Sequence, residues 1–279
     1  WSFRSPYSYL ATPRLVQIEK EYDVRVNVKP VLPLALRKPE FFEQVNPLWP
    51  PYLLRDTFRI SQYLGLDYSW PRPDPVVQEF PSRKIAAEQP YAPRLTRLGQ
   101  LATERGRGLP FIFEISTAIW NGKNANWHEG TVLAEAAARA GLDLAELDAL
   151  AISEQARLDG RIAQNQADLE AAGHWGVPTM VFEGEPFFGQ DRLDLLLWRV
   201  ARERALLLNK AYRVIVSDQD YIHGRDATVT PPANVYERID NATTPTLPAE
   251  FVHDWDIRLD WRAARQSAHA ASRALTKQP

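Results

Sequence analysis

Hydrophobic and polar residues alternate at residues 24–31, where Val-Arg-Val-Asn-Val-Lys-Pro-Val has a period of two and predicts a half-buried β-strand. Before it, apolar residues from Leu10 to Ile18 have helical spacing, and this helix should begin at Ser5. Residues 1–4 resemble the end of an earlier strand. The order strand, helix, strand predicts a βαβ unit.

A β-hairpin is predicted near residue 180. The apolar run Gly-Val-Pro-Thr-Met-Val-Phe at 176–182 is followed by Glu-Gly-Glu and then by Pro-Phe-Phe at 186–188. A tight turn with glycine between two apolar runs is typical of a hairpin. Gly189 and the two residues after it should then open a leucine-rich helix.

The chain between these two regions has a helical pattern. Proline punctuates residues 39–93, and helices are expected at 52–64, 91–105, 110–121, 129–140, 143–157 and 159–172. The run at 110–121 is apolar throughout, which predicts a buried helix. Gly141 and Gly160 should separate the last three helices. We interpret residues 34–173 as a helical insert.

The C-terminal segment, residues 209–279, has a different composition. It is rich in Pro, Asp, Asn and Thr to about residue 250 and ends in a predicted helix at 261–275. Its many aromatic residues predict an arm that wraps its own domain or a dimer partner, and a contribution to substrate selection stays open. Its role is unknown.

Composition narrows the possible functions. The 279 residues are 45% hydrophobic with a formal charge of −2, which suits a globular chain without a general attraction to nucleic acid or acidic membranes. Neither a signal peptide nor a run of about 18 apolar residues is present, so we expect a cytoplasmic protein without a membrane span. The chain opens at Trp1, within an expected strand, so we expect that a few residues precede it.

The sequence contains no cysteine. This excludes disulfides, thiolate metal sites and a dithiol redox cycle by the protein's own side chains. The five histidines lack the spacing of a metal motif, so no metal is expected.

The first motif with chemical potential is Ser5-Pro6-Tyr7-Ser8, at the predicted strand-to-helix turn. Serine followed by proline is a strong helix start. The free N–H groups and the dipole of a helix N-terminus favour an anion there. Ser5 is therefore either a helix cap or a donor to a thiolate that arrives on a cofactor.

The second motif is Val177-Pro178, at the start of the predicted hairpin. Proline cannot donate to a strand ladder. It marks either an edge strand or, as in thioredoxin folds, a cis-proline that leaves the backbone of the preceding residue free for a peptide-like ligand.

The third motif is Gly189-Gln190-Asp191-Arg192. Asp191 could cap its helix. Alternatively, it accepts from an ammonium group while Gln190 and the helix N–H groups hold a carboxylate. That combination fits the γ-glutamyl end of glutathione.

Together these motifs resemble the 2-hydroxychromene-2-carboxylate isomerases and the related kappa-class glutathione transferases. The resemblance covers about residues 1–205. It rests on Phe-Arg-Ser-Pro-Tyr-Ser-Tyr-Leu-Ala at 3–11, Gly-Val-Pro-Thr at 176–179 and Phe-Phe-Gly-Gln-Asp-Arg-Leu at 187–193, with Tyr52-x-x-x-Asp56 and Ala-Ile-Trp at 118–120 between them. Tyr-Leu-Ala after the serine motif is closer to the isomerases.

The resemblance implies an α/β fold in three parts. Residues 1–33 and 174–208 would form a discontinuous thioredoxin-like (DsbA-like) domain, and residues 34–173 an inserted all-helical domain. Residues 209–279 would be a C-terminal extension outside the family pattern. The resemblance also implies a homodimer that uses glutathione as cofactor on a small-molecule substrate.

The resemblance further implies roles for single residues. Ser5 would be the catalytic residue that faces the glutathione sulfur, and Val177, before Pro178, would pair with the cysteinyl unit. Cofactor contacts would also come from Gln190, Asp191, Arg192 and Asn46, and substrate contacts are expected from Tyr7, Ser8 and Trp49.

One position departs from the family pattern. Relatives often carry lysine where this chain has Trp49, and that lysine helps to bind glutathione. Either Arg37, Lys38 or Arg55 substitutes for it, or the thiol is held differently.

Three functions follow from the resemblance. The expected one is isomerisation, in which the thiolate adds to an activated double bond, allows rotation and leaves. The alternatives are a kappa-like transferase that releases a stable conjugate and a non-catalytic thioredoxin-fold binding module. Apolar residues of the insert, such as Trp49, Phe113 and Trp120, suggest an aromatic or polyketide-like substrate, although core packing explains them equally well.

Overall fold

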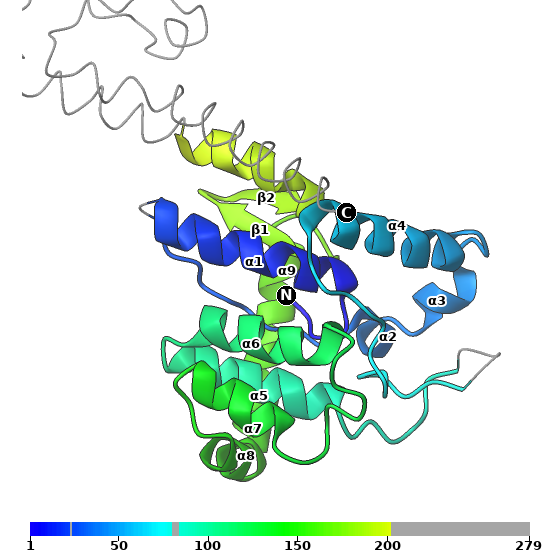
Figure 1. Cartoon of the computed structure of the whole chain (residues 1–279), viewed down its shortest axis with the longest axis vertical. Coiled ribbons are helices and arrows are strands. Elements are labelled where there is room, and N and C mark those ends of the chain that lie inside the picture. Colours follow the sequence, from blue (N-terminus) through cyan, green and yellow to red (C-terminus); the bar gives the residue numbers. More distant parts are fainter. Residues whose placement is uncertain (23, 80–83, 202–279) are drawn as a thin grey trace, which may run out of the picture. The chain divides into compact units, whose positions relative to one another are not determined.

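The computed structural model describes residues 1–22, 24–79 and 84–201. The chain divides into two compact units, Trp1–Leu193 and Asp194–Pro279, and only residues 194–201 of the second are described. The elements of the first unit are α1 (Pro6–Glu21), α2 (Leu34–Arg37), α3 (Glu40–Gln44), α4 (Trp49–Leu64), α5 (Ala92–Glu104), α6 (Gly108–Trp120), α7 (Val132–Arg139), α8 (Leu144–Ser153), α9 (Gln155–Ala171), β1 (Thr179–Phe182), β2 (Glu185–Phe188) and the 3₁₀ helix η1 (Gln190–Arg192) (Figure 1).

The β1–β2 hairpin confirms the hairpin predicted near residue 180. The strands are antiparallel, with Thr179 opposite Phe188 and Phe182 opposite Glu185. A two-residue loop joins them, and both of its residues have a positive φ, 50° at Glu183 and 82° at Gly184. Such a loop matches the twist of the flanking strands.

The strands predicted at residues 1–4 and 24–31 were wrong, because residues 3 and 4 form a turn and residues 24–31 have no regular secondary structure. Two hydrogen bonds join the segments: the Trp1 ammonium donates to the Lys29 carbonyl at 3.2 Å, and the Val31 N–H donates to the Trp1 carbonyl at 2.9 Å. The pairing ends there because Val26 N–H donates instead to the Glu19 carboxylate, at 2.8 Å. The period-two pattern does predict burial, since Val28 and Val31 are buried.

Helix α6 lies at the centre of the core. It packs against α1, α5 and α7, and α5 to α8 gather on one side of α1 in Figure 1. Residues on most faces of α6 are buried, as its apolar sequence predicted. Trp120, fully buried at its C-terminal end, donates its indole N–H to the Phe3 carbonyl at 2.9 Å. Helix α6 thereby fixes the segment that precedes Ser5.

The breaks between α7, α8 and α9 were predicted only in part. Gly141, with φ of 78°, lies between α7 and α8 as expected. Gly160, in contrast, lies inside α9, and the break falls at Glu154. A helical glycine costs about 1 kcal/mol, which the burial of Leu158 and Ile162 on either side of it outweighs.

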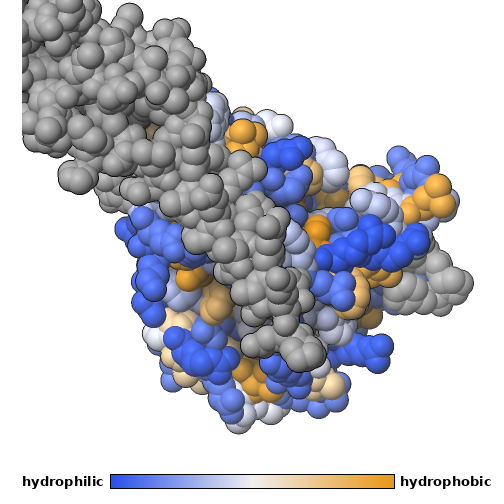
Figure 2. Space-filling view, turned by 45° about the horizontal axis from the view of Figure 1, so that its top comes forward, coloured by the Kyte–Doolittle hydropathy of each residue, from blue (hydrophilic) through white to orange (hydrophobic). Residues whose placement is uncertain are grey.

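The surface of the described residues mixes both kinds of side chain. On the face drawn in Figure 2, orange hydrophobic residues are interspersed with blue hydrophilic ones. Scattered exposed apolar residues are ordinary for a globular surface. Among the described helices, none is long and apolar enough to span a membrane. The predictions for residues 209–279, including the helix at 261–275, lie outside the described residues.

Candidate functional site

Ser5 caps the N-terminus of α1, as its sequence predicted. Its extended backbone (φ −91°, ψ 114°) marks the N-terminal boundary of the helix, and its Oγ accepts a hydrogen bond from the Ser8 N–H at 3.2 Å. Pro6 occupies the first helical position, where a missing N–H has no cost. The hydroxyl therefore lies at the positive end of a 16-residue helix.

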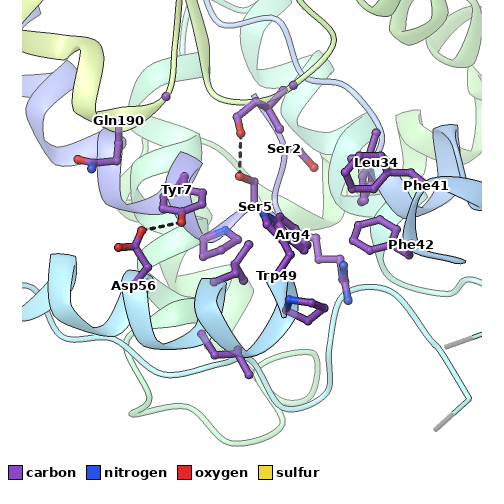
Figure 3. A pocket seen from close by; sticks show the side chains of 18 of the residues that line it. Ser2, Arg4, Ser5, Tyr7, Leu34, Phe41, Phe42, Trp49, Asp56 and Gln190 are labelled. Carbon is purple, nitrogen blue, oxygen red and sulfur yellow. Dashed lines mark hydrogen bonds between the residues drawn. The ribbon is translucent and has the colours of Figure 1, made fainter. Parts of the chain in front are cut away.

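The loop before β1 brings Val177 to this serine. The Val177–Pro178 peptide bond is cis, as the thioredoxin pattern predicted. Ser5 Oγ donates to the Val177 carbonyl at 3.2 Å (Figure 3), whereas the Val177 N–H has no partner among the described residues. The loop is held by the Gly189 N–H, which donates to the Pro178 carbonyl at 2.9 Å. Residues 172 positions apart thus share one site.

The segment after β2 completes this corner. Gly189 has φ of 101°, where a side chain is strained, and a Cβ there would overlap the Asp191 carboxylate. Gln190 is 9% exposed, whereas the Asp191 side chain is 60% exposed and forms an ion pair with Arg192 at 2.8 Å. Asp191 does not cap the helix, since no side-chain cap bond is present at η1.

A cavity of about 950 Å³ opens beside Ser5. Its wall is largely aromatic, and its polar groups come from the N-terminal segment, α2, α4, the loop that contains Asp74 and the residues around η1. The aromatic lining residues are Tyr7, Phe41, Phe42, Trp49, Tyr52, Trp70, Trp175 and Phe188. Figure 3 shows Phe41, Phe42 and Trp49 together on one side of the cavity. Such a lining suits a flat, conjugated molecule.

Arg4 is a rigid part of the wall. Its guanidinium binds Asp74 through two hydrogen bonds of 2.8 and 2.9 Å, and the two side chains are only 13% and 21% exposed. Asp74 also accepts from the Trp70 indole at 3.2 Å and from the Val76 N–H at 2.9 Å. Because its partner is saturated, this cation has little charge to offer a ligand.

Tyr7 and Asp56 face each other from α1 and α4 (Figure 3). The Tyr7 hydroxyl donates to one carboxylate oxygen at 2.7 Å, and the Tyr52 hydroxyl lies 3.4 Å from the other. Burial, followed by the hydrogen bond to Asp56, raises the pKa of Tyr7 well above its ordinary value. Tyr7 therefore keeps its proton at neutral pH and acts as a hydrogen-bonding group, not as a base.

The cavity brings together most of the predicted site residues. Ser5, Tyr7, Trp49, Val177, Gln190 and Asp191 line it. Ser8, Asn46, Pro178 and Arg192 do not: Ser8 is buried on α1, and the exposed Asn46 accepts from the Leu48 N–H at 3.0 Å. The described residues contain no cluster that could hold a metal ion.

The three cations proposed in place of the family lysine differ in position. Arg37 lines the cavity. Lys38 forms an ion pair with Glu170 at 3.6 Å, and the exposed Arg55 donates to the Pro51 carbonyl at 3.3 Å. Of these alternatives, the cavity favours Arg37.

Several residues of the cavity wall were not predicted from the sequence, among them Ser2, Arg4, Asp74 and Trp175. Only the neighbouring aromatic residues Phe41, Phe42 and Trp49, in a proline-rich stretch, gave a signal that sequence could have used. Arg4 and Asp74 are 70 residues apart, and nothing local indicates that they pair.

Comparisons with known proteins agree with this architecture. The family model for the DSBA-like thioredoxin domain matches residues 1–201. Among solved structures, the chain is similar to a 2-hydroxychromene-2-carboxylate isomerase, with 21% identity and a TM-score of 0.57 over 74% of this chain and 96% of that one. At this identity, the likeness concerns the fold. No curated protein matches the chain.

Proposed function

The chain belongs to the DsbA-like thioredoxin family, and from this premise we propose that it is a glutathione-dependent isomerase similar to 2-hydroxychromene-2-carboxylate isomerase. The family and the DsbA-like thioredoxin fold predicted from the sequence are confirmed for residues 1–201. One observation carries the proposed reaction. Ser5, where redox members of the fold place cysteine, directs its hydroxyl at the Val177 carbonyl on the edge of an aromatic cavity.

The backbone beside Ser5 supports binding of a peptide-like thiol. The Val177 N–H has no partner among the described residues, and the Val177 carbonyl accepts from a hydroxyl that can turn away. An extended peptide needs such a donor and acceptor on one residue. Asp191 and Gln190 lie along the same wall and suit the ammonium and carboxylate of a γ-glutamyl group.

Glutathione, when bound, would supply the thiolate that adds to an activated double bond and later leaves it. The chain's own part is to stabilise negative charge at one point. Ser5 Oγ–H and the positive end of the α1 dipole would do this, and they would lower the pKa of a thiol bound there below its free value near 8.5.

The aromatic wall binds and orients the second molecule. Stacking on Trp49 and its neighbours holds a conjugated ring system and excludes water from the sulfur site. Tyr7, which stays protonated and donates its proton to Asp56, can accept a hydrogen bond from a hydroxyl of the substrate without removing the proton of that hydroxyl. The cavity is therefore proposed to take an aromatic or polyketide-like substrate.

The experiment that tests this function follows labelled glutathione. The chain is incubated with ³⁵S-glutathione and a cis-configured aryl enone, and the geometry of the product is read by NMR. We expect the trans isomer without bound label. A labelled product would favour a kappa-like transferase, and absence of glutathione binding by calorimetry would favour the non-catalytic binding module.

A homodimer remains a prediction from the family resemblance, and a cytoplasmic location remains a prediction from the sequence. Equilibrium sedimentation of the full chain checks the first.

A further inference from the structure

The guanidinium of Arg37 is only partly satisfied. Arg37 is the last residue of α2, and its Nε donates to the Leu32 carbonyl at 2.8 Å. One terminal nitrogen, Nη2, donates to the Trp175 carbonyl at 3.1 Å. The other, Nη1, is buried and has no hydrogen-bond partner. Two donors thus fix the plane of the group, and a third is left unused.

Arg37 also forms no ion pair within the part of the chain that the structure describes. Glu170, which acts on it from farther away, pairs with Lys38 at 3.6 Å. Burial accordingly lowers the pKa of Arg37, although an arginine stays protonated at any ordinary pH. A partly buried cation without an ion-pair partner is costly, and an anion would reduce that cost.

Ser2 provides a second unused donor in the same cavity. The residue is 1% exposed, and its Oγ is buried without a hydrogen-bond partner. Ser2 and Arg37 both line the cavity beside Ser5, and Figure 3 shows Ser2 close to Ser5. Buried polar atoms without partners are rare in proteins, so two of them on residues that line one cavity point to a ligand.

The other charged groups that line the cavity already have partners. Arg4, the other lining cation, is paired with Asp74, Asp191 is paired with Arg192, and Asp56 accepts from the Tyr7 hydroxyl. An anionic ligand entering the described cavity therefore meets its uncompensated positive charge at Arg37. A planar carboxylate suits a planar guanidinium better than a spherical ion does.

We propose that Arg37 and Ser2 form a carboxylate subsite of the cavity. Trp175, which Arg37 contacts, lies two residues before Val177, so the subsite adjoins the position proposed for the cysteinyl unit. The carboxylate belongs either to the glycyl end of glutathione or to the second substrate. The first source rests on the proposed function, whereas the subsite itself does not.

The test compares each acid with a neutral analogue by calorimetry on the full chain. One pair is glutathione and its glycyl monoethyl ester, and the other is 2-naphthoate and 2-naphthamide. Arg37→Met, which keeps the side-chain stem, should weaken binding of one acid about 10–100-fold and leave its neutral analogue unchanged. Ser2→Ala should weaken the same acid about 2–10-fold. Lys38→Met, which removes a neighbouring paired cation, is the matched control and should change neither pair.

Each outcome decides a point. A selective loss for glutathione assigns the subsite to the glycyl carboxylate, and a selective loss for naphthoate assigns it to the second substrate. If Arg37→Met weakened binding of the acid and of its neutral analogue equally, the proposed carboxylate subsite would be wrong. Arg37 would then have only a structural role, through its hydrogen bonds to Leu32 and Trp175. If circular dichroism shows that Arg37→Met does not fold, the same comparison of each acid with its neutral analogue is made with Arg37→Lys and Ser2→Ala. A wild-type chain that binds naphthoate but neither form of glutathione would contradict the proposed function and keep the subsite.

Discussion

Replacing Ser5 by alanine tests the central serine most directly. The change removes one oxygen that has two structural partners, the Ser8 N–H and the Val177 carbonyl, each at 3.2 Å. Loss of an N-cap costs about 0.5–2 kcal/mol of folding stability, and loss of a hydrogen bond about 0.5–1.5 kcal/mol. We therefore expect the free energy of unfolding to fall by about 1–3 kcal/mol.

The effect on turnover should be larger and separable. Loss of one donor to a developing anion typically costs about 10²–10³ in rate. Turnover of the cis aryl enone is measured at saturating glutathione, so that weaker binding does not contribute. Ser5→Gly restores all but a few tenths of a kcal/mol of the cap without restoring the hydroxyl, and should be as slow as the alanine variant. Ser5→Thr, which keeps both, should retain most of the activity.

Two results would refute this reasoning. Wild-type turnover in a folded Ser5→Ala protein would show that the hydroxyl does not act on the sulfur. Recovery of turnover in Ser5→Gly would show that the alanine variant was slow because α1 had lost its cap. Urea unfolding of all three variants supplies the stability values for the comparison.

Three further changes have expected outcomes. Asp191→Asn should raise the Kd for glutathione about two- to fivefold with little change in kcat, because the exposed carboxylate acts equally in the ground and transition states. Calorimetry measures the Kd, and Asp159→Asn, which also breaks an exposed ion pair, is the control. Gly189→Ala, at a φ of 101°, should lower stability by about 1–3 kcal/mol in urea unfolding, whereas Gly160→Ala, with open space around it, should raise stability by about 0.5–1 kcal/mol. Burial raises the pKa of Tyr9 from 10.0 to about 12. The protonated Tyr9 side chain therefore contributes fully to folding stability below pH 10, and this contribution is lost as the pH rises towards 12. Tyr9→Phe should flatten the resulting decline in melting temperature at alkaline pH.

The features that the sequence predicted correctly are local ones. A serine before a proline caps α1, and a two-residue loop with Gly184 joins β1 and β2. An apolar run from residue 110 forms the buried helix α6. In each of these, neighbouring residues decide the backbone conformation, so one sequence without context is sufficient. The relation between Ser5 and Val177 came from the family resemblance and not from any local pattern.

The features that the sequence did not predict depend on distant partners. Residues 24–31 have the pattern of a strand, but a ladder needs a neighbour, and Glu19 takes the N–H of Val26. The cavity wall is another example, because Trp175 and Arg37 meet across 138 residues of chain. Arg37 Nη1 is an unused donor because no acceptor lies within hydrogen-bond distance of it. Such an absence depends on the folded structure and cannot be predicted from the sequence.

The bond from Ser5 to Val177 has a consequence for which state of a sulfur the site accepts. A serine hydroxyl has one proton, so it cannot donate to the carbonyl and to a sulfur at the same time. A neutral thiol is a weak acceptor and does not draw that proton away from the carbonyl. A thiolate does, because hydrogen bonds to charged acceptors are about twice as strong as neutral ones. If glutathione binds as proposed, the resting hydrogen bond from Ser5 to the Val177 carbonyl would therefore favour binding of the thiolate over binding of the neutral thiol.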